Sequence, residues 1–154
     1  MLALAMLLCS CGSEATYDTP QEFTYNGLTL TLTTDFKMEN PPDAFTGYYE
    51  ADGAVVMTLF ESLDQLAAAG FDEVKTLEDY TKVVAGEYEV KSDEEAEIMY
   101  FTFERKADFK DYYYLAVTKQ TDDGFWLIQY ACRAKDKDMF SDMFLDWAKK
   151  AKIV

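Results

Sequence analysis

Three strand-like runs followed by an amphipathic helix constrain the fold of this chain most. The runs cover residues 96–105, 112–120 and 125–133, and successive side chains in each differ in character, as in a β-strand with two distinct faces. From Phe140 onward the apolar spacing becomes helical. The helical stripe consists of Phe140, Met143, Phe144, Trp147, Ala148 and Ala151. This order predicts an antiparallel meander of three strands and a helix that packs on it.

Two hairpins are expected before the meander. Residues 22–25 and 28–32 flank Asn26-Gly27, a pair that supplies the positive φ angles of a type I′ turn. Residues 46–50 and 54–61 form a second hairpin around the turn 51–53. Apolar side chains alternate on both sides of 54–61, so we expect both faces of that strand to be covered.

Two short helices are expected between the second hairpin and the meander. Ser62 with Gln65, and Thr76 with Asp79, have the spacing of a capping box, in which side chains satisfy the free amides of the first turn. The first helix should end near Gly70 and the second near Gly86. The apolar stripe expected for the second helix is Leu77, Tyr80, Val83 and Val84.

Groups of consecutive strands separated by groups of helices are typical of an α+β fold with an antiparallel sheet. We therefore expect residues 22–154 to form a single α+β domain in which helices flank the sheet. The 154-residue length agrees with one domain that buries a sizeable core.

The N-terminal residues are typical of an export signal. Residues 1–10 are an apolar run too short to span a bilayer but long enough for the core of a signal peptide. The basic segment that normally begins such a peptide is missing, so we expect the true start to lie upstream. The alternatives are a truncated ordinary secretory peptide and a fragment of a buried helix.

The residues that follow, Leu8-Cys9-Ser10-Cys11, resemble a bacterial lipobox. This resemblance implies cleavage after Ser10, diacylglycerol on the sulfur of Cys11, and a membrane partner reached through that lipid on the extracytoplasmic face. Residues 11–21 would then be the lipidated cysteine and its tether, since they show no periodicity.

The charge and the absence of histidine restrict function. With 14 Lys and Arg against 29 Asp and Glu, the net charge is −15, which disfavours nucleic acid as a partner. The lack of histidine removes the commonest general base and metal ligand, so we expect no cofactor, no metal and no enzyme activity. Cys132 lies in a strand-like run and is expected to be a buried thiol.

From residue 22 to residue 154 the order of elements resembles the PsbP/Mog1-like α/β/α sandwich. The cues are residues 27–32 with Phe36, the helix start 76–80, and residues 125–132 followed by a helix with Trp147. The final segment is also similar to a lipoprotein family of gut Firmicutes. The rival topology is a cystatin/NTF2-like cone. The resemblance implies only a non-catalytic adaptor or binding role, because no contact motif of the family maps onto this chain.

Three tyrosines are candidate ligand-binding residues: Tyr48, Tyr112 and Tyr114. Tyrosine offers a large apolar face with a polar tip, so these residues would line a groove or pocket for a protein or small-molecule ligand. The alternative is ordinary packing within a sheet. A hydrolase that uses paired carboxylates is a third reading, for which the 29 acidic residues give no specific signal.

Overall fold

The computed structural model describes residues 15–154, so the predicted signal peptide and Cys11 lie outside the described residues. Residues 15–154 contain three α-helices and ten strands in two antiparallel sheets. The smaller sheet has the order β1 (Pro20–Tyr25), β2 (Leu28–Thr33) and β10 (Lys152–Ile153). The larger sheet has the order β3 (Lys37–Glu39), β4 (Gly47–Ala51), β5 (Ala54–Ser62), β9 (Gly124–Arg133), β8 (Lys110–Gln120), β7 (Ile98–Ala107) and β6 (Lys91–Asp93). The helices are α1 (Leu63–Ala68), α2 (Leu77–Ala85) and α3 (Lys137–Lys150), with a 3-10 turn (Ala134–Asp136) before α3.

The first predicted hairpin is confirmed. Tyr25 pairs with Leu28, which leaves Asn26 and Gly27 as a two-residue turn with φ angles of 49° and 85°. Both angles are positive, as a type I′ turn requires.

Both predicted capping boxes are also present. The side chains of Ser62 and Gln65 exchange hydrogen bonds with each other's backbone amides at the start of α1, and Thr76 and Asp79 do the same at α2. Reciprocal bonds of this kind let two short helices begin at fixed residues. The stripe expected for α2 is wrong at Val83, which is 44% exposed, because the helix turns Thr81 and Ala85 toward the sheet instead.

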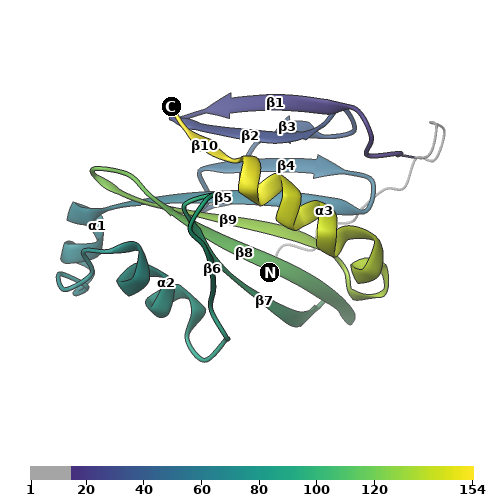
Figure 1. Cartoon of the computed structure of the whole chain (residues 1–154). Coiled ribbons are helices and arrows are strands. Elements are labelled where there is room, and N and C mark those ends of the chain that lie inside the picture. The colour runs from purple at the N-terminus through teal and green to yellow at the C-terminus, as the bar shows by residue number, and fades with distance from the viewer. Residues whose placement is uncertain (1–14) are drawn as a thin grey trace.

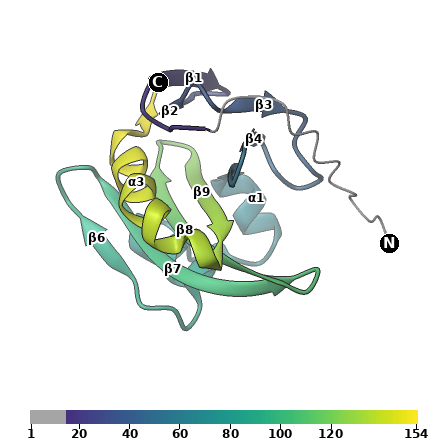
Figure 2. The same cartoon turned by 90° about the vertical axis from the view of Figure 1, so that its right-hand side faces the viewer.

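The larger sheet lies between two layers. The smaller sheet and α3 lie on one side of it, and α1 and α2 lie on the other (Figure 1). Figure 2 shows the hairpin of β7 and β8 projecting beyond α3. The predicted α+β architecture, with helices on both sides of an antiparallel sheet, is therefore confirmed.

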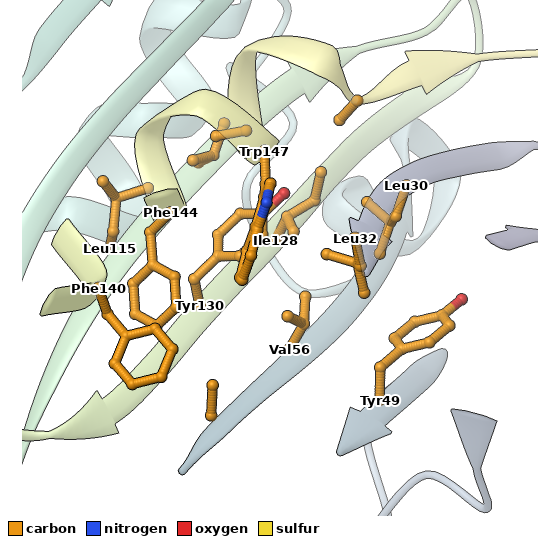
Figure 3. Close-up of a cluster of buried hydrophobic side chains, with 14 of the residues drawn as sticks. Leu30, Leu32, Tyr49, Val56, Leu115, Ile128, Tyr130, Phe140, Phe144 and Trp147 are labelled. Atoms are coloured by element: carbon orange, nitrogen blue, oxygen red, sulfur yellow. The ribbon is translucent and has the colours of Figure 1, made fainter. Parts of the chain in front are cut away.

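The face of the larger sheet that packs on α3 is called the closed face below. Alternate residues of β5, β8 and β9 point into it and meet the predicted stripe of α3 (Figure 3). Phe140 and Phe144 have no exposed surface, and Trp147 is 6% exposed. The β1–β2 hairpin adds Leu30 and Leu32 to the same core. Burying such side chains stabilises a fold by about 1.5–3 kcal/mol each, so this layer contributes most of the apolar stabilisation.

The domain begins earlier than expected. The backbone N–H of Tyr17 donates to a carboxylate oxygen of Asp35 at 3.0 Å, and the Tyr17 ring lies edge-on to Phe140 at 5.1 Å. The strand β1 begins at Pro20. Residues 17–21, expected to be tether, are therefore part of the folded domain, because an aromatic anchor and strand pairing hold them.

Candidate ligand-binding face

The second face of the larger sheet is covered at one end only. In paired antiparallel strands, residues opposite each other share a face. One row across this face consists of Phe103, Tyr114, Ala131, Val55, Glu50 and Lys37, and the next consists of Phe101, Ala116, Gln129, Met57, Tyr48 and Glu39. Arg105, Tyr112 and Arg133 form a shorter row beside the first.

The helices α1 and α2 pack over the other end of this face. The Tyr80 ring stacks on Phe125 at 4.6 Å, and the hydroxyls of Thr81 and Thr118 lie 2.6 Å apart. Because α1 and α2 are only 6 and 9 residues long, they bury Phe101 and Ala116 but leave the other side chains of these rows at least partly exposed or covered only by neighbouring side chains such as Tyr88. Figure 1 shows both helices at one end of the sheet.

The uncovered part is called the open half-face below. Its partly exposed side chains are Tyr48, Val55, Met57, Phe103, Tyr112, Tyr114 and Gln129. The expectation that both faces of the strand 54–61 are covered is wrong here, since Val55 and Met57 are only partly buried.

The structure brings the three predicted tyrosines onto this one surface. Tyr112 and Tyr114 are two residues apart on β8, and Tyr48 comes from β4 with the same facing. The Tyr114 ring stacks on Phe103 at 4.7 Å and nearly parallel to it. Burial, with Glu50 and Glu39 nearby, raises the pKa of Tyr48, and burial raises the pKa of Tyr114. Both phenols therefore keep their protons and remain hydrogen-bond donors, while their ligand-binding role stays a prediction.

A pocket of about 690 Å³ lies at the end of the open half-face. Among the three tyrosines only Tyr112 lines it, together with Val55 and Ala131 on its floor. The remaining lining comes from the β4–β5 turn, the segment around Lys37, the β7–β8 hairpin and the residues after β9. Its size falls within the range of small-molecule sites.

Arg133 is a candidate binding residue of this pocket that the sequence analysis missed. Its guanidinium carbon lies 5.5 Å from the centre of the Tyr112 ring, and its Nε is buried without a hydrogen-bond partner in residues 15–154. None of the ion pairs within those residues involves it. Arg133 is partly exposed and lines the pocket, so its guanidinium group is a donor that a ligand carboxylate could meet there.

Cys132 also borders the pocket, but it points into the closed face. Its side chain is 2% exposed, which confirms the buried thiol expected from the sequence. Burial, with a smaller contribution from Asp136, raises the pKa of the thiol to about 12. The thiolate needed for nucleophilic attack is therefore disfavoured at neutral pH.

Asp79 and Asp93 are carboxyl groups whose pKa values are lowered by hydrogen bonds. Hydrogen bonds from Thr76 lower the pKa of Asp79, and the backbone amide of Ala96 lowers that of Asp93. A general acid needs the opposite shift, toward neutral pH. These two carboxylates cap a helix and a turn.

A second hollow of about 590 Å³ surrounds the buried Lys119 beside β10. The ammonium group of Lys119 donates to the carbonyl oxygen of Ala96 at 2.9 Å, and burial lowers its pKa. This bond ties β8 to the β6–β7 turn, and we assign it a structural role.

Two further observations concern residues 15–154 only. No three Asp, Glu or Cys side chains of this region are grouped so that they could hold a metal ion. None of its helices has the length and apolar character needed to cross a membrane.

Comparison with known proteins identifies the class of fold. No protein-family model matches the sequence, and no curated protein matches it. Among solved structures, the chain is similar to cyanobacterial PsbP (CyanoP) from Synechocystis sp. PCC 6803, with 11% identity, 96% of this chain and 99% of that chain covered, and a TM-score of 0.50. It therefore has a PsbP-like fold, as the resemblance implied.

A second solved structure is LpqN of Mycobacterium tuberculosis, described as involved in cell envelope biogenesis. The identity is 8%, the coverage is 88% of this chain and 90% of that chain, and the TM-score is 0.46. The relation to a Firmicutes lipoprotein family stays a prediction.

Proposed function

We propose that this chain is a non-catalytic binding module, held by a lipid on Cys11 at the extracytoplasmic face of a membrane, and that the open half-face binds its partner. The observation that carries the proposal is the half-face itself. It is a sheet surface with several partly exposed aromatic rings and two arginines, Arg105 and Arg133. Tyrosine and arginine contribute strongly to binding energy at interfaces.

The chemistry of the domain supports binding over catalysis. The sequence has no histidine, burial keeps the Cys132 thiol protonated, and the pKa values of Asp79 and Asp93 are lowered. A catalytic site usually holds groups whose pKa values are shifted toward neutral pH.

A small-molecule ligand is the second candidate partner. The pocket at the end of the half-face favours it, since about 690 Å³ is enough for a ligand of modest size. A protein partner would instead contact the rows of Tyr48 and Tyr114.

The binding proposal is tested by comparing variants on a column. The full chain is immobilised and exposed to detergent-solubilised cell envelope, as wild type, as Tyr114→Ser and as Tyr25→Ser. Tyr25 is the matched control, because it is 41% exposed on β1, away from the half-face. We expect wild type and Tyr25→Ser to retain the same molecule and Tyr114→Ser to lose it. Equal retention by all three would contradict the proposal.

The anchor is tested by intact-mass analysis of the membrane fraction. We expect a diacylglyceryl adduct on the chain that begins at Cys11, and its loss in Cys11→Ala. A released chain without the adduct would contradict lipid anchoring.

A further inference from the structure

The pocket beside Arg133 has two oppositely charged sides. Lys110, Arg133 and Lys135 line one side with a single carboxylate, that of Asp136. The other side, from β3, β4 and the neighbouring turns, has one lysine and four carboxylates: Lys37, Asp35, Glu39, Glu50 and Asp52. None of these groups belongs to an ion pair within residues 15–154. Asp35 already accepts hydrogen bonds from Tyr17 and Thr33, and the other charged groups of the two sides can act on whatever enters the pocket.

An apolar floor separates the two sides. Val55 and Ala131 lie opposite each other on β5 and β9 and both line the pocket. The strand β5 lies between β4 and β9. Neighbouring strands are about 4.8 Å apart, and Arg133 lies two residues beyond Ala131 on β9, so the backbones at Glu50 and Arg133 are roughly 12 Å apart. Three extended residues of a peptide span about 10–11 Å, so the side chains of Glu50 and Arg133 can reach toward its two ends.

Arg133 is suited to a carboxylate. Its guanidinium group packs near the Tyr112 ring, which restricts its orientation, and an arginine fork binds a carboxylate through two parallel hydrogen bonds. Arg133 is partly exposed where it lines the pocket and has no ion-pair partner in residues 15–154.

We infer that this pocket binds a small zwitterion of the amino-acid or short-peptide class, with its carboxylate at Arg133 and its ammonium group near Glu50. A simple anion would meet five carboxylates in the pocket and a net charge of −15 on the chain. A simple cation would leave Arg133 without an acceptor. A zwitterion satisfies both sides and adds no net charge. The inference rests on the proposed binding function and names its ligand class.

The probe is the tripeptide Ala-Leu-Ala, titrated into the full chain by calorimetry in three forms: with free termini, N-acetylated and C-amidated. We expect the free form to bind and each blocked form to bind about tenfold more weakly, because one charged contact is lost in each. Binding of the free form that is no tighter than that of the blocked forms, or no binding at 10 mM peptide, would overturn the inference.

Variants of the pocket assign each terminus to its side. In Arg133→Gln we expect the free peptide to bind about tenfold more weakly and C-amidation to have no further effect. In Glu50→Gln we expect the free peptide to bind about tenfold more weakly and N-acetylation to have no further effect. Lys91→Gln is the matched control, because Lys91 is an exposed cation on β6 that belongs to neither the open half-face nor the pocket lining. An equal effect of amidation in wild type and Arg133→Gln would overturn the assignment.

These experiments distinguish failure of the zwitterion inference from failure of the proposed binding function. If the tripeptide fails while Tyr114→Ser still loses an envelope partner, the half-face binds a partner and the zwitterion inference is wrong. If the tripeptide binds as expected while Tyr114→Ser retains the envelope partner, the pocket site stands and the wider binding surface is wrong.

Discussion

On the closed face, α3 and the smaller sheet bury Phe140, Phe144 and Trp147 against three strands, whereas on the opposite face α1 and α2 cover only one end of the same strands. The covered end is held by polar links such as the bond between Thr81 and Thr118. The other end keeps aromatic rings in partial contact with solvent. Stabilising side chains and side chains available to a ligand are therefore separated on the two faces of one sheet.

The largest expected effect is on the closed face. Phe144→Ala should lower the free energy of unfolding by about 3–5 kcal/mol, because it removes a fully buried ring from the centre of the core. Urea denaturation followed by tryptophan fluorescence measures this change. A loss below about 1 kcal/mol would mean that the closed face does not dominate stability.

A pair of buried tyrosines, one on each face, sharpens the comparison. The hydroxyl of Tyr80 donates to a carboxylate oxygen of Glu61 at 2.6 Å, whereas the hydroxyl of Tyr130 has no partner within residues 15–154. Tyr80→Phe should therefore cost about 1.5–3 kcal/mol, and Tyr130→Phe should leave stability unchanged or slightly higher. Thermal or urea unfolding of both variants checks this. Equal losses of unfolding free energy in the two variants would show that the hydrogen bond of Tyr80 under α2 stabilises the fold no more than the unpaired hydroxyl of Tyr130 in the closed face.

The pH dependence of stability should report the burial of Cys132. Burial raises the pKa of its thiol from 9.0 to about 12 in the folded chain. Below pH 9 both states hold the proton, so the stabilisation from burial is intact. As the pH rises further, the unfolded chain loses the proton first, and stability falls toward pH 12.

Between pH 8 and pH 9.5 the thiol alone should account for a loss of about 0.8 kcal/mol, and the buried tyrosines with raised pKa values add a loss that wild type and Cys132→Ala share. Urea unfolding of wild type and Cys132→Ala at both pH values measures it, and the variant should show a flatter dependence. Identical slopes would place Cys132 in contact with solvent instead of inside the closed face.

The sequence predicted those elements whose signals are local. Asn26-Gly27 predicted its hairpin, the capping residues Ser62 and Thr76 predicted two helix starts, and the apolar spacing predicted α3. The short strands β3, β6 and β10 were missed, because two or three residues carry no periodicity and pair only where the fold brings a partner alongside.

The candidate site was predicted only in part. The candidate tyrosines Tyr112 and Tyr114 lie on one face of β8, as residues two apart in a strand do. Arg133 and Glu50 could not be linked to them, because these residues are far apart in sequence and only the order β4-β5-β9-β8 brings them to one pocket. The prediction that Val83 is buried was also wrong. An apolar residue at the edge of the buried stripe of a short helix can face either the core or the solvent.

Tyr112 and Tyr113 test the central claim most directly, because they are neighbours in sequence that point to opposite faces of β8. The measurement is the free energy of unfolding of Tyr113→Ser and Tyr112→Ser. Tyr113 is 4% exposed against α3, so its loss should cost about 3 kcal/mol, while Tyr112 on the open half-face should cost no more than about 1 kcal/mol. Equal costs, or a larger cost for Tyr112, would show that the open half-face is needed for folding and would contradict its assignment as a surface free for binding.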